Sequence, residues 1–192
     1  MTLPTPSSSL IDVRPPLLGM LLAVLGAAAV ALAPAPSHAA GEDDATPATV
    51  CPDGKVWSED KKACVDLKSG ALPDAQLYRQ GSRLAKAGHY EKAIRVLSAV
   101  VDRDNPKVLN YLGYSHRKMG RIGEGVAYYK KALAIDPDYV LAREYLGEGY
   151  VAAGRMELAE DQLAEIAKRC GTDCKAYRQL AAAISGTPSE TW

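Results

Sequence analysis

The four cysteines are the residues whose chemistry is most constrained by their spacing. Cys51 and Cys64 form one close pair, and Cys170 and Cys174 form another. An even number of cysteines at short spacings is typical of disulfides formed in an oxidising compartment, and the spacing predicts the pairs Cys51–Cys64 and Cys170–Cys174. A shared zinc site is the competing interpretation. It is disfavoured because neither pair has the two-residue gap of a zinc knuckle, so we expect no metal.

Few other residues are of the types that catalyse reactions. The chain has three histidines; His116 is expected on the packed side of a helix and His89 in a solvated turn. The chain shows no glycine-rich phosphate loop and no serine at a strand-to-helix turn. We therefore expect a protein that is not an enzyme and has no cofactor.

The composition is that of a globular protein without overall charge. Of the 192 residues, 47% are hydrophobic and 24% are charged, and 23 basic residues balance 23 acidic ones. A neutral chain has no general electrostatic attraction for nucleic acid or for an anionic membrane surface. Recognition of a partner must therefore depend on a local surface.

The first part of the chain, residues 1–39, has the layout of a secretory signal peptide. Arg14 precedes an apolar run at 17–33, and small residues follow up to Ala39, where we expect cleavage. The competing interpretation is an uncleaved membrane anchor, because such a run is at the lower limit of what spans a bilayer. A periplasmic or secreted protein is expected, with a flexible spacer at 40–50.

Segment 51–66 predicts a small disulfide-closed hairpin. Two short strand-like pairs at 56–57 and 64–65 flank a polar stretch at 58–62 that can turn the chain back. Closing this loop with a disulfide would contribute about 3 kcal/mol, roughly what so small a unit lacks in core. Trp57 is its only large apolar side chain.

Glycines at a regular interval indicate an internal repeat. Gly81, Gly113 and Gly147 are separated by 32 and then 34 residues, and each is followed seven residues later by another glycine. The apolar residues around them have helical spacing. We therefore expect helix pairs at 74–87 with 90–103, 106–119 with 122–135, and 139–153 with 156–169.

Local signals predict where these helices begin and end. Asn-Pro at 105–106 and Asp-Pro at 136–137 each place a capping side chain before a proline at the first helical position. Thr172 or Asp173 is expected to cap one more helix. The first helix of each pair should end at a glycine, namely Gly88, Gly120 and Gly154.

The pattern resembles the tetratricopeptide repeat, a pair of amphipathic helices with a period near 34 residues. The segment "NYLGYSHRKMGRIGEGVAYYKKALAIDP" fits best, lacking mainly an aromatic where Leu109 stands. The resemblance covers about residues 74 to 170. It implies an all-α fold, a right-handed superhelix of three repeats at 74–105, 106–139 and 140–171.

A repeat array needs a terminal cap, because its last helix otherwise exposes apolar surface. We expect a capping helix within 172–185 that uses Ala176, Leu180 and Ile184, followed by a disordered tail at 186–192. The Cys170–Cys174 disulfide would fix the angle between the last repeat and this cap.

In the family that the chain resembles, the first helix of each pair lines a concave groove along which extended peptides commonly lie. A competing interpretation is a solvated face on which Arg117 and Glu148 only neutralise each other. The family's best-known groove holds the terminal carboxylate of chaperone tails with basic residues. It is disfavoured because Leu141, Tyr145 and Glu148 stand where basic side chains would be needed. Helical spacing assigns these residues to the groove: Tyr78, Ser82, Lys86, Asn110, Tyr114, Arg117, Lys118, Glu144, Glu148 and Val151.

The leading functional expectation is a non-enzymatic adaptor of the cell envelope that binds a protein segment in this groove. Self-association into a homo-oligomer is an open alternative. A different class of function also stays open, since small cysteine-and-tryptophan loops of secreted proteins resemble segment 51–66, and Trp57 could bind envelope polysaccharide. A third alternative is an accessory subunit of an envelope enzyme complex.

Overall fold

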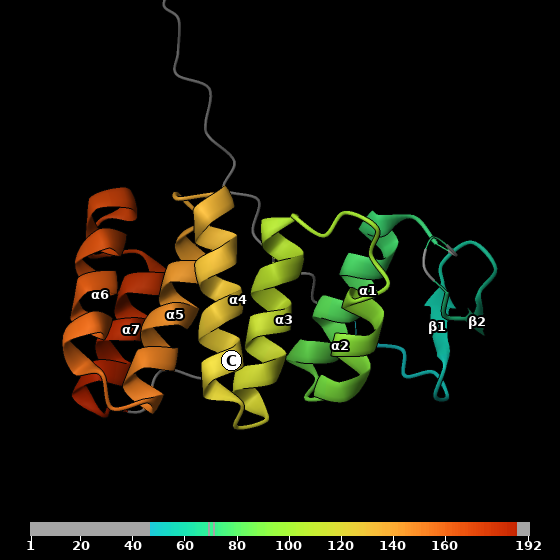
Figure 1. The fold of residues 1–192 in the computed structure, drawn as a ribbon, viewed down its shortest axis with the longest axis horizontal. Helices are drawn as coiled ribbons and strands as arrows, with labels where there is room; N and C mark the ends of the chain where they lie inside the picture. The colour runs from blue at the N-terminus through green and yellow to red at the C-terminus, as the bar shows by residue number, and fades with distance from the viewer. Residues whose placement is uncertain (1–46, 69, 71, 188–192) are drawn as a thin grey trace, which may run out of the picture. The chain divides into compact units, whose positions relative to one another are not determined.

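A computed structural model of the chain describes residues 47–68, 70 and 72–187 (Figure 1). The predicted signal peptide and most of the predicted spacer and tail lie outside these residues. Across the described part of the chain, no helix is long and apolar enough to cross a membrane. The elements are β1 (Lys55–Ser58), β2 (Ala63–Asp66), α1 (Asp74–Lys86), α2 (Tyr90–Leu97), α3 (Pro106–Lys118), α4 (Ile122–Ile135), α5 (Val140–Ala152), α6 (Met156–Cys170) and α7 (Lys175–Ser185).

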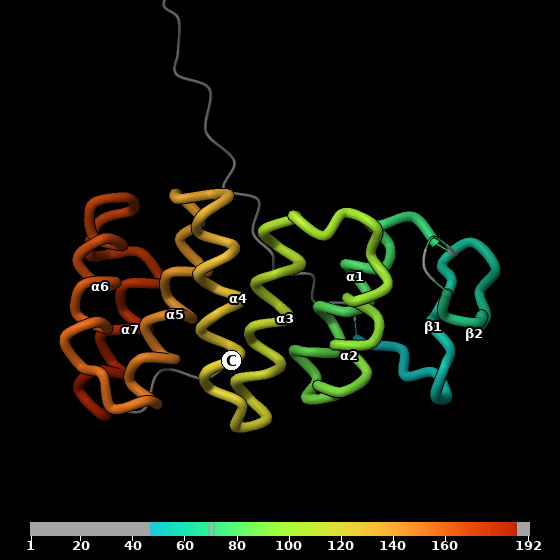
Figure 2. Tube along the Cα trace, viewed as in Figure 1, coloured from blue at the N-terminus to red at the C-terminus, as the bar shows by residue number. Residues whose placement is uncertain are grey.

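The helices pack as consecutive pairs, which confirms the all-α repeat fold. Helix α1 packs against α2, α3 against α4 and α5 against α6, with tight turns between the partners (Figure 2). The first helices also contact one another, α1 with α3, α3 with α5, and α5 with α7. We call the surface that these first helices share the inner face. It is the place where side chains from different repeats meet.

Glycine ends the first helix of every pair, as predicted. Gly88, Gly120 and Gly154 have φ values of +83°, +80° and +70°, in the left-handed region that residues with a Cβ rarely adopt. Gly113 has a different role, because a Cβ there would lie 2.8 Å from the ring of Tyr129 and 3.0 Å from a backbone oxygen of α4. Glycine at this position lets α3 and α4 approach closely.

Helix α2 is shorter than predicted and ends at Leu97 instead of continuing to residue 103. The backbone amides of Val101 and Asp102 each donate a 2.9 Å hydrogen bond to the carboxylate of Asp74, at the start of α1. These amides are therefore satisfied by a side chain from the neighbouring helix and not by helical carbonyls. The prediction was wrong because this contact is not local in sequence.

The two proline-containing junctions differ. Asn105 caps α3 as predicted, since its side chain accepts hydrogen bonds from the amides of the second and third helical residues. Asp136 does not start a helix, which corrects the prediction. Its side chain accepts a 3.1 Å hydrogen bond from the amide of Asp138, forming a turn, and α5 begins only at Val140.

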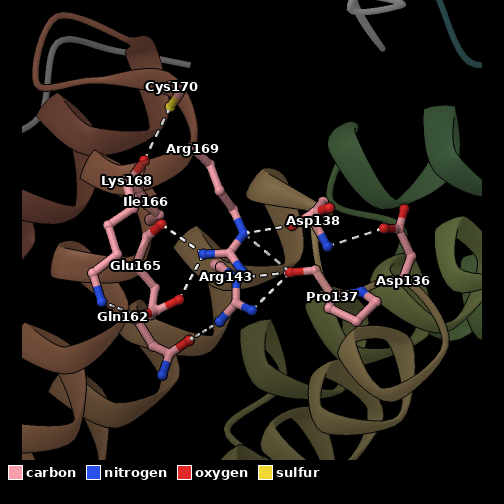
Figure 3. A network of polar contacts seen from close by, with 10 residues as sticks. All are labelled: Asp136, Pro137, Asp138, Arg143, Gln162, Glu165, Ile166, Lys168, Arg169 and Cys170. Atoms are coloured by element: carbon pink, nitrogen blue, oxygen red, sulfur yellow. Dashed lines mark hydrogen bonds and ion pairs between the residues drawn. The ribbon is translucent and has the colours of Figure 1, made fainter.

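A network of arginines holds this second junction against the third repeat (Figure 3). The carbonyl oxygen of Pro137 accepts hydrogen bonds from Arg143 at 2.7 and 3.1 Å and from Arg169 at 3.2 Å. Arg169 also forms ion pairs with Asp138 at 3.0 Å and with Glu165 at 2.6 Å. The linker between the second and third repeats is thus tied to both α5 and α6 of the third repeat.

Helix α7 caps the array at its C-terminal end. Ala176 and Leu180 are buried against Ile166 of α6, and Ile184 packs beside them, as predicted. The residue before the helix is Cys174, which makes no side-chain capping hydrogen bond. The predicted capping role of Thr172 or Asp173 is therefore wrong.

Both predicted disulfides are present, Cys51–Cys64 and Cys170–Cys174. The first closes the hairpin, in which β1 and β2 pair antiparallel with Trp57 opposite Cys64. The second spans the turn between α6 and α7 and ties the capping helix to the last repeat.

The hairpin packs onto the first repeat instead of standing apart from it. Val56 is buried in the main apolar core beside residues of α1 and α2. Glu59 forms ion pairs with Arg79 at 2.6 Å and with Arg83 at 3.5 Å, both on α1. Asp53 forms a 2.7 Å ion pair with Arg95 of α2. The hairpin therefore serves as an N-terminal cap of the array.

Candidate functional site

A row of tyrosines crosses the inner face from α1 to α5. The ring centroids of Tyr78 and Tyr111 are 6.0 Å apart, those of Tyr111 and Tyr114 are 6.2 Å apart, and those of Tyr114 and Tyr145 are 5.2 Å apart. Burial raises the pKa of Tyr114 to about 12 and that of Tyr145 further in the same direction. The phenols of Tyr114 and Tyr145 are therefore uncharged at neutral pH. Like Tyr111 they are buried, so the row contributes packing between the first helices of the repeats.

Sequence reasoning missed Tyr111 as a member of this row. A signal for it existed, because Tyr111 is three residues before Tyr114 and therefore close to it on the same helix. It also occupies the position of Tyr145 one repeat earlier, 34 residues away. On this helix, the spacing used to assign the groove selected Asn110, Tyr114, Arg117 and Lys118, and it left out Tyr111.

Arg117 and Glu148 pair with each other across the second and third repeats, as one interpretation of the sequence held. Their closest atoms are 2.5 Å apart, and their side chains are only 10% and 12% exposed. Arg117 also donates a 3.2 Å hydrogen bond to the hydroxyl of Tyr129, and its guanidinium lies over the rings of Tyr114 and Tyr145. The pair is therefore a buried contact between repeats and not a solvated surface pair.

Two polar side chains of the first helices have hydrogen-bonding atoms that no described residue satisfies. Asn110 is 0% exposed and Glu144 is 1% exposed. Within the described part of the chain, neither the oxygen nor the nitrogen of the Asn110 amide has a hydrogen-bond partner, and neither does Oε1 of Glu144. A buried polar group left in this state costs about 1 to 3 kcal/mol. The two residues are 34 apart, at equivalent positions of α3 and α5.

The carboxyl group of Glu144 holds its proton unusually strongly. Burial, and secondarily the charge of Glu148, raise its pKa to about 8, against opposing effects of Lys175 and Arg117. At neutral pH it is therefore mostly a neutral acid. No ion pair between described residues includes it.

The remaining predicted groove residues lie at different depths. The ammonium groups of Lys86 and Lys118 lie over tyrosine rings, 5.7 Å from the centroid of Tyr111 and 5.5 Å from that of Tyr114. Ser82 is buried, and its hydroxyl donates to a carbonyl of its own helix at 3.1 Å, so that donor is already used. Val151 is partly buried in the apolar core.

His116 is a buried packing residue, as expected. Its ring stacks on that of Tyr128 with centroids 5.3 Å apart, and its Nδ1 lies 2.8 Å from a carboxylate oxygen of Glu124. Burial lowers the pKa of His116, which favours the neutral ring.

Trp57 lies on the strand face opposite to Val56 and is half-buried, and its role in glycan binding stays a prediction.

Helix pairs that stack through a shared inner face define a helical-repeat protein, and comparison with known sequences specifies the class. Tetratricopeptide repeat family models match residues 78–140 and residues 116–184, together more than half of the chain. The chain belongs to the tetratricopeptide repeat family. This confirms the resemblance inferred from residues 74 to 170.

One curated relative is the tetratricopeptide repeat domain-containing protein PYG7, chloroplastic, of Arabidopsis thaliana. It is 26% identical over 106 residues, which are 52% of this chain and 35% of that protein. The chain therefore spans about a third of the length of that relative.

Solved structures share the fold at low sequence identity. MamA has a TM-score of 0.52 with 20% identity, over 59% of this chain and 67% of that one. The Yersinia enterocolitica type III secretion chaperone SycD, in complex with a peptide of the translocator YopD, has a TM-score of 0.50 with 20% identity, over 58% and 86%. The first repeat domain of Spaghetti (RPAP3), bound to the HSP90 peptide SRMEEVD, has a TM-score of 0.51 with 18% identity, over 62% and 97%.

Proposed function

We propose that this protein is an exported, non-enzymatic adaptor of the cell envelope whose inner face holds an extended segment of another protein. The observation that carries the proposal is the amide of Asn110, which is fully buried and has neither its donor nor its acceptor satisfied by the described residues. A side-chain amide that makes no hydrogen bond with the described residues and costs stability is best explained by an interaction outside the folded chain.

An extended peptide backbone matches the chemistry of this amide. Each peptide unit presents one N–H donor and one C=O acceptor, and a primary amide can accept from the first and donate to the second. Tyrosines are common anchors in protein interfaces, and Tyr78, the partly buried tyrosine of the row, lies on the preceding repeat. The solved structures of SycD and RPAP3, which share this fold, each contain a bound peptide, and this supports the same use of the fold here.

Removing the amide of Asn110 separates a binding role from a structural one. We expect Asn110→Leu to lose the protein partner that the wild type captures from envelope extract, while its melting temperature stays equal or rises. The stability gain follows because an unsatisfied buried amide is replaced by an apolar side chain. Asn110→Ala repeats the test with a smaller side chain, in case leucine does not fit.

Gln76→Leu is the matched control. Gln76 is also a buried amide with an unpartnered oxygen, but it lies on α1 near Glu59 of the hairpin and not on the inner face. The proposal requires that Gln76→Leu still captures the partner. A partner that is retained by folded Asn110→Leu and Asn110→Ala would show that the inner face is not the binding site.

A further inference from the structure

Glu144 lies one helical turn before a carboxylate that already binds one cation. Four residues further along α5, Glu148 binds the guanidinium of Arg117, which also lies 5.7 Å from the ring centroid of Tyr114 and 5.8 Å from that of Tyr145. A carboxylate together with tyrosine rings is a well-suited environment for a positive charge. The chain fills one such place with its own arginine.

Glu144 has no such cation paired with it among the described residues. Its Oε1 has no hydrogen-bond partner, although Tyr145 is adjacent in sequence. Three charged groups act on the carboxyl: Glu148 on the same helix, Arg117 on α3 and Lys175 on α7. Arg117 is committed to Glu148 and Tyr129, and Lys175 is an exposed residue at the first position of α7.

We propose that Glu144 receives a lysine or arginine side chain of the bound segment, so that the inner face selects partners with a basic residue at this position. The inference rests on the proposed function and names the chemistry of its partner. It places the cation one repeat from the peptide unit that Asn110 holds. A basic side chain would act at Glu144 as Arg117 acts at Glu148.

Binding of a cation should be linked to release of a proton. The free protein holds Glu144 mostly protonated at pH 7, because burial raises its pKa to about 8. An arriving ammonium or guanidinium favours the ionised carboxylate, so the carboxyl proton passes to the solvent and an ion pair remains. Affinity should therefore rise close to tenfold per pH unit between about pH 6 and pH 7.5.

A randomised dodecapeptide library displayed on phage supplies the probe. We expect selection on the purified wild-type protein to enrich peptides with a lysine or arginine at one fixed position, and selection on Glu144→Gln to lose that preference. For a selected peptide, replacing the basic residue by glutamine should weaken binding to the wild type by about tenfold, and to Glu144→Gln by less than about twofold.

Calorimetry in buffers of different ionisation enthalpy counts the protons. The wild type should release close to one proton per bound peptide at pH 7, and Glu144→Gln should release none. If Glu144 were merely structural, peptide binding would release no proton from it, so wild type and Glu144→Gln would give the same proton count. Glutamine also preserves the shape of the side chain.

The outcomes separate the two proposals. If no peptide is enriched on the wild type, or if the enriched peptides bind Asn110→Leu equally well, the proposed function fails. If peptides bind in an Asn110-dependent way but show no basic preference, or bind without releasing a proton, only the role of Glu144 is overturned.

Discussion

At the scale of single residues, burial affects two titratable groups of this protein in opposite directions. Glu144 has its pKa raised to about 8, so the folded state binds a proton that the unfolded state releases above its ordinary pKa near 4.5. The contribution of the Glu144 carboxyl to stability is therefore largest below its ordinary pKa of 4.5 and decreases as the pH rises from there to about 8. Burial lowers the pKa of His116, so its contribution is present above the ordinary value of 6.5 and is lost as the pH falls.

Glu144→Gln should make the folded protein less sensitive to high pH. We expect the variant to be more stable than the wild type by about 1 to 3 kcal/mol at pH 8 and nearly equal to it at pH 5, because glutamine removes the ionisation of residue 144 that favours the unfolded wild type at high pH. Urea unfolding at pH 5, 7 and 8 measures the difference. An equal gain at all three pH values would show that ionisation of Glu144 is not the cause.

At the scale of secondary structure, glycine positions decide how closely the helices of a repeat can pack. Gly113 of α3 faces the ring of Tyr129 and the backbone of α4 without space for a methyl group. Gly123 of α4 has no neighbouring atom within 4 Å of where its Cβ would be. The same residue type is therefore required at one position and dispensable at the other.

Gly113→Ala and its matched control Gly123→Ala should change stability in opposite directions. We expect Gly113→Ala to lose about 1 to 3 kcal/mol through overpacking of α3 against α4. Gly123→Ala should gain about 0.5 to 1 kcal/mol, because alanine is the better helix former and meets no neighbour. Thermal or urea unfolding compares the two, and equal effects would exclude close packing as the role of Gly113.

At the scale of the whole molecule, the described array is closed at both ends by disulfide-linked elements of different kinds. The hairpin contributes Val56 to the core and binds α1 and α2 through Glu59 and Asp53. At the other end α7 covers Ile166, and a second disulfide holds its turn. Three repeats are close to the minimum that such stacking tolerates, so both caps are expected to contribute to stability.

The proposed export of the protein can be tested by expressing residues 1–192. We expect expression in a bacterial host to yield a periplasmic or secreted protein whose first residue is Ala40, with all four cysteines oxidised. N-terminal sequencing and mass spectrometry with and without reductant measure both properties. A membrane fraction that retains the intact N-terminus would instead support the alternative of an uncleaved anchor at 17–33.

The sequence by itself determined the repeat, its helix pairs, the glycines that end the first helices and both disulfides. These features could be predicted because each depends on residues close in the chain or on a regular period. The end of α2 at Leu97 and the turn at Asp136 were not predicted correctly, because one depends on Asp74 from another helix and the other on a local side-chain hydrogen bond.

Only the tertiary structure showed that the hairpin caps the array and that Tyr111 joins the row of tyrosines. It also showed that the amide of Asn110 and Oε1 of Glu144 are buried without a hydrogen-bond partner among the described residues. Helical spacing places a residue on a face, but it does not show how deeply that face is buried. Burial and hydrogen-bond satisfaction depend on which side chains from other helices surround a group, and those side chains are brought together only by packing.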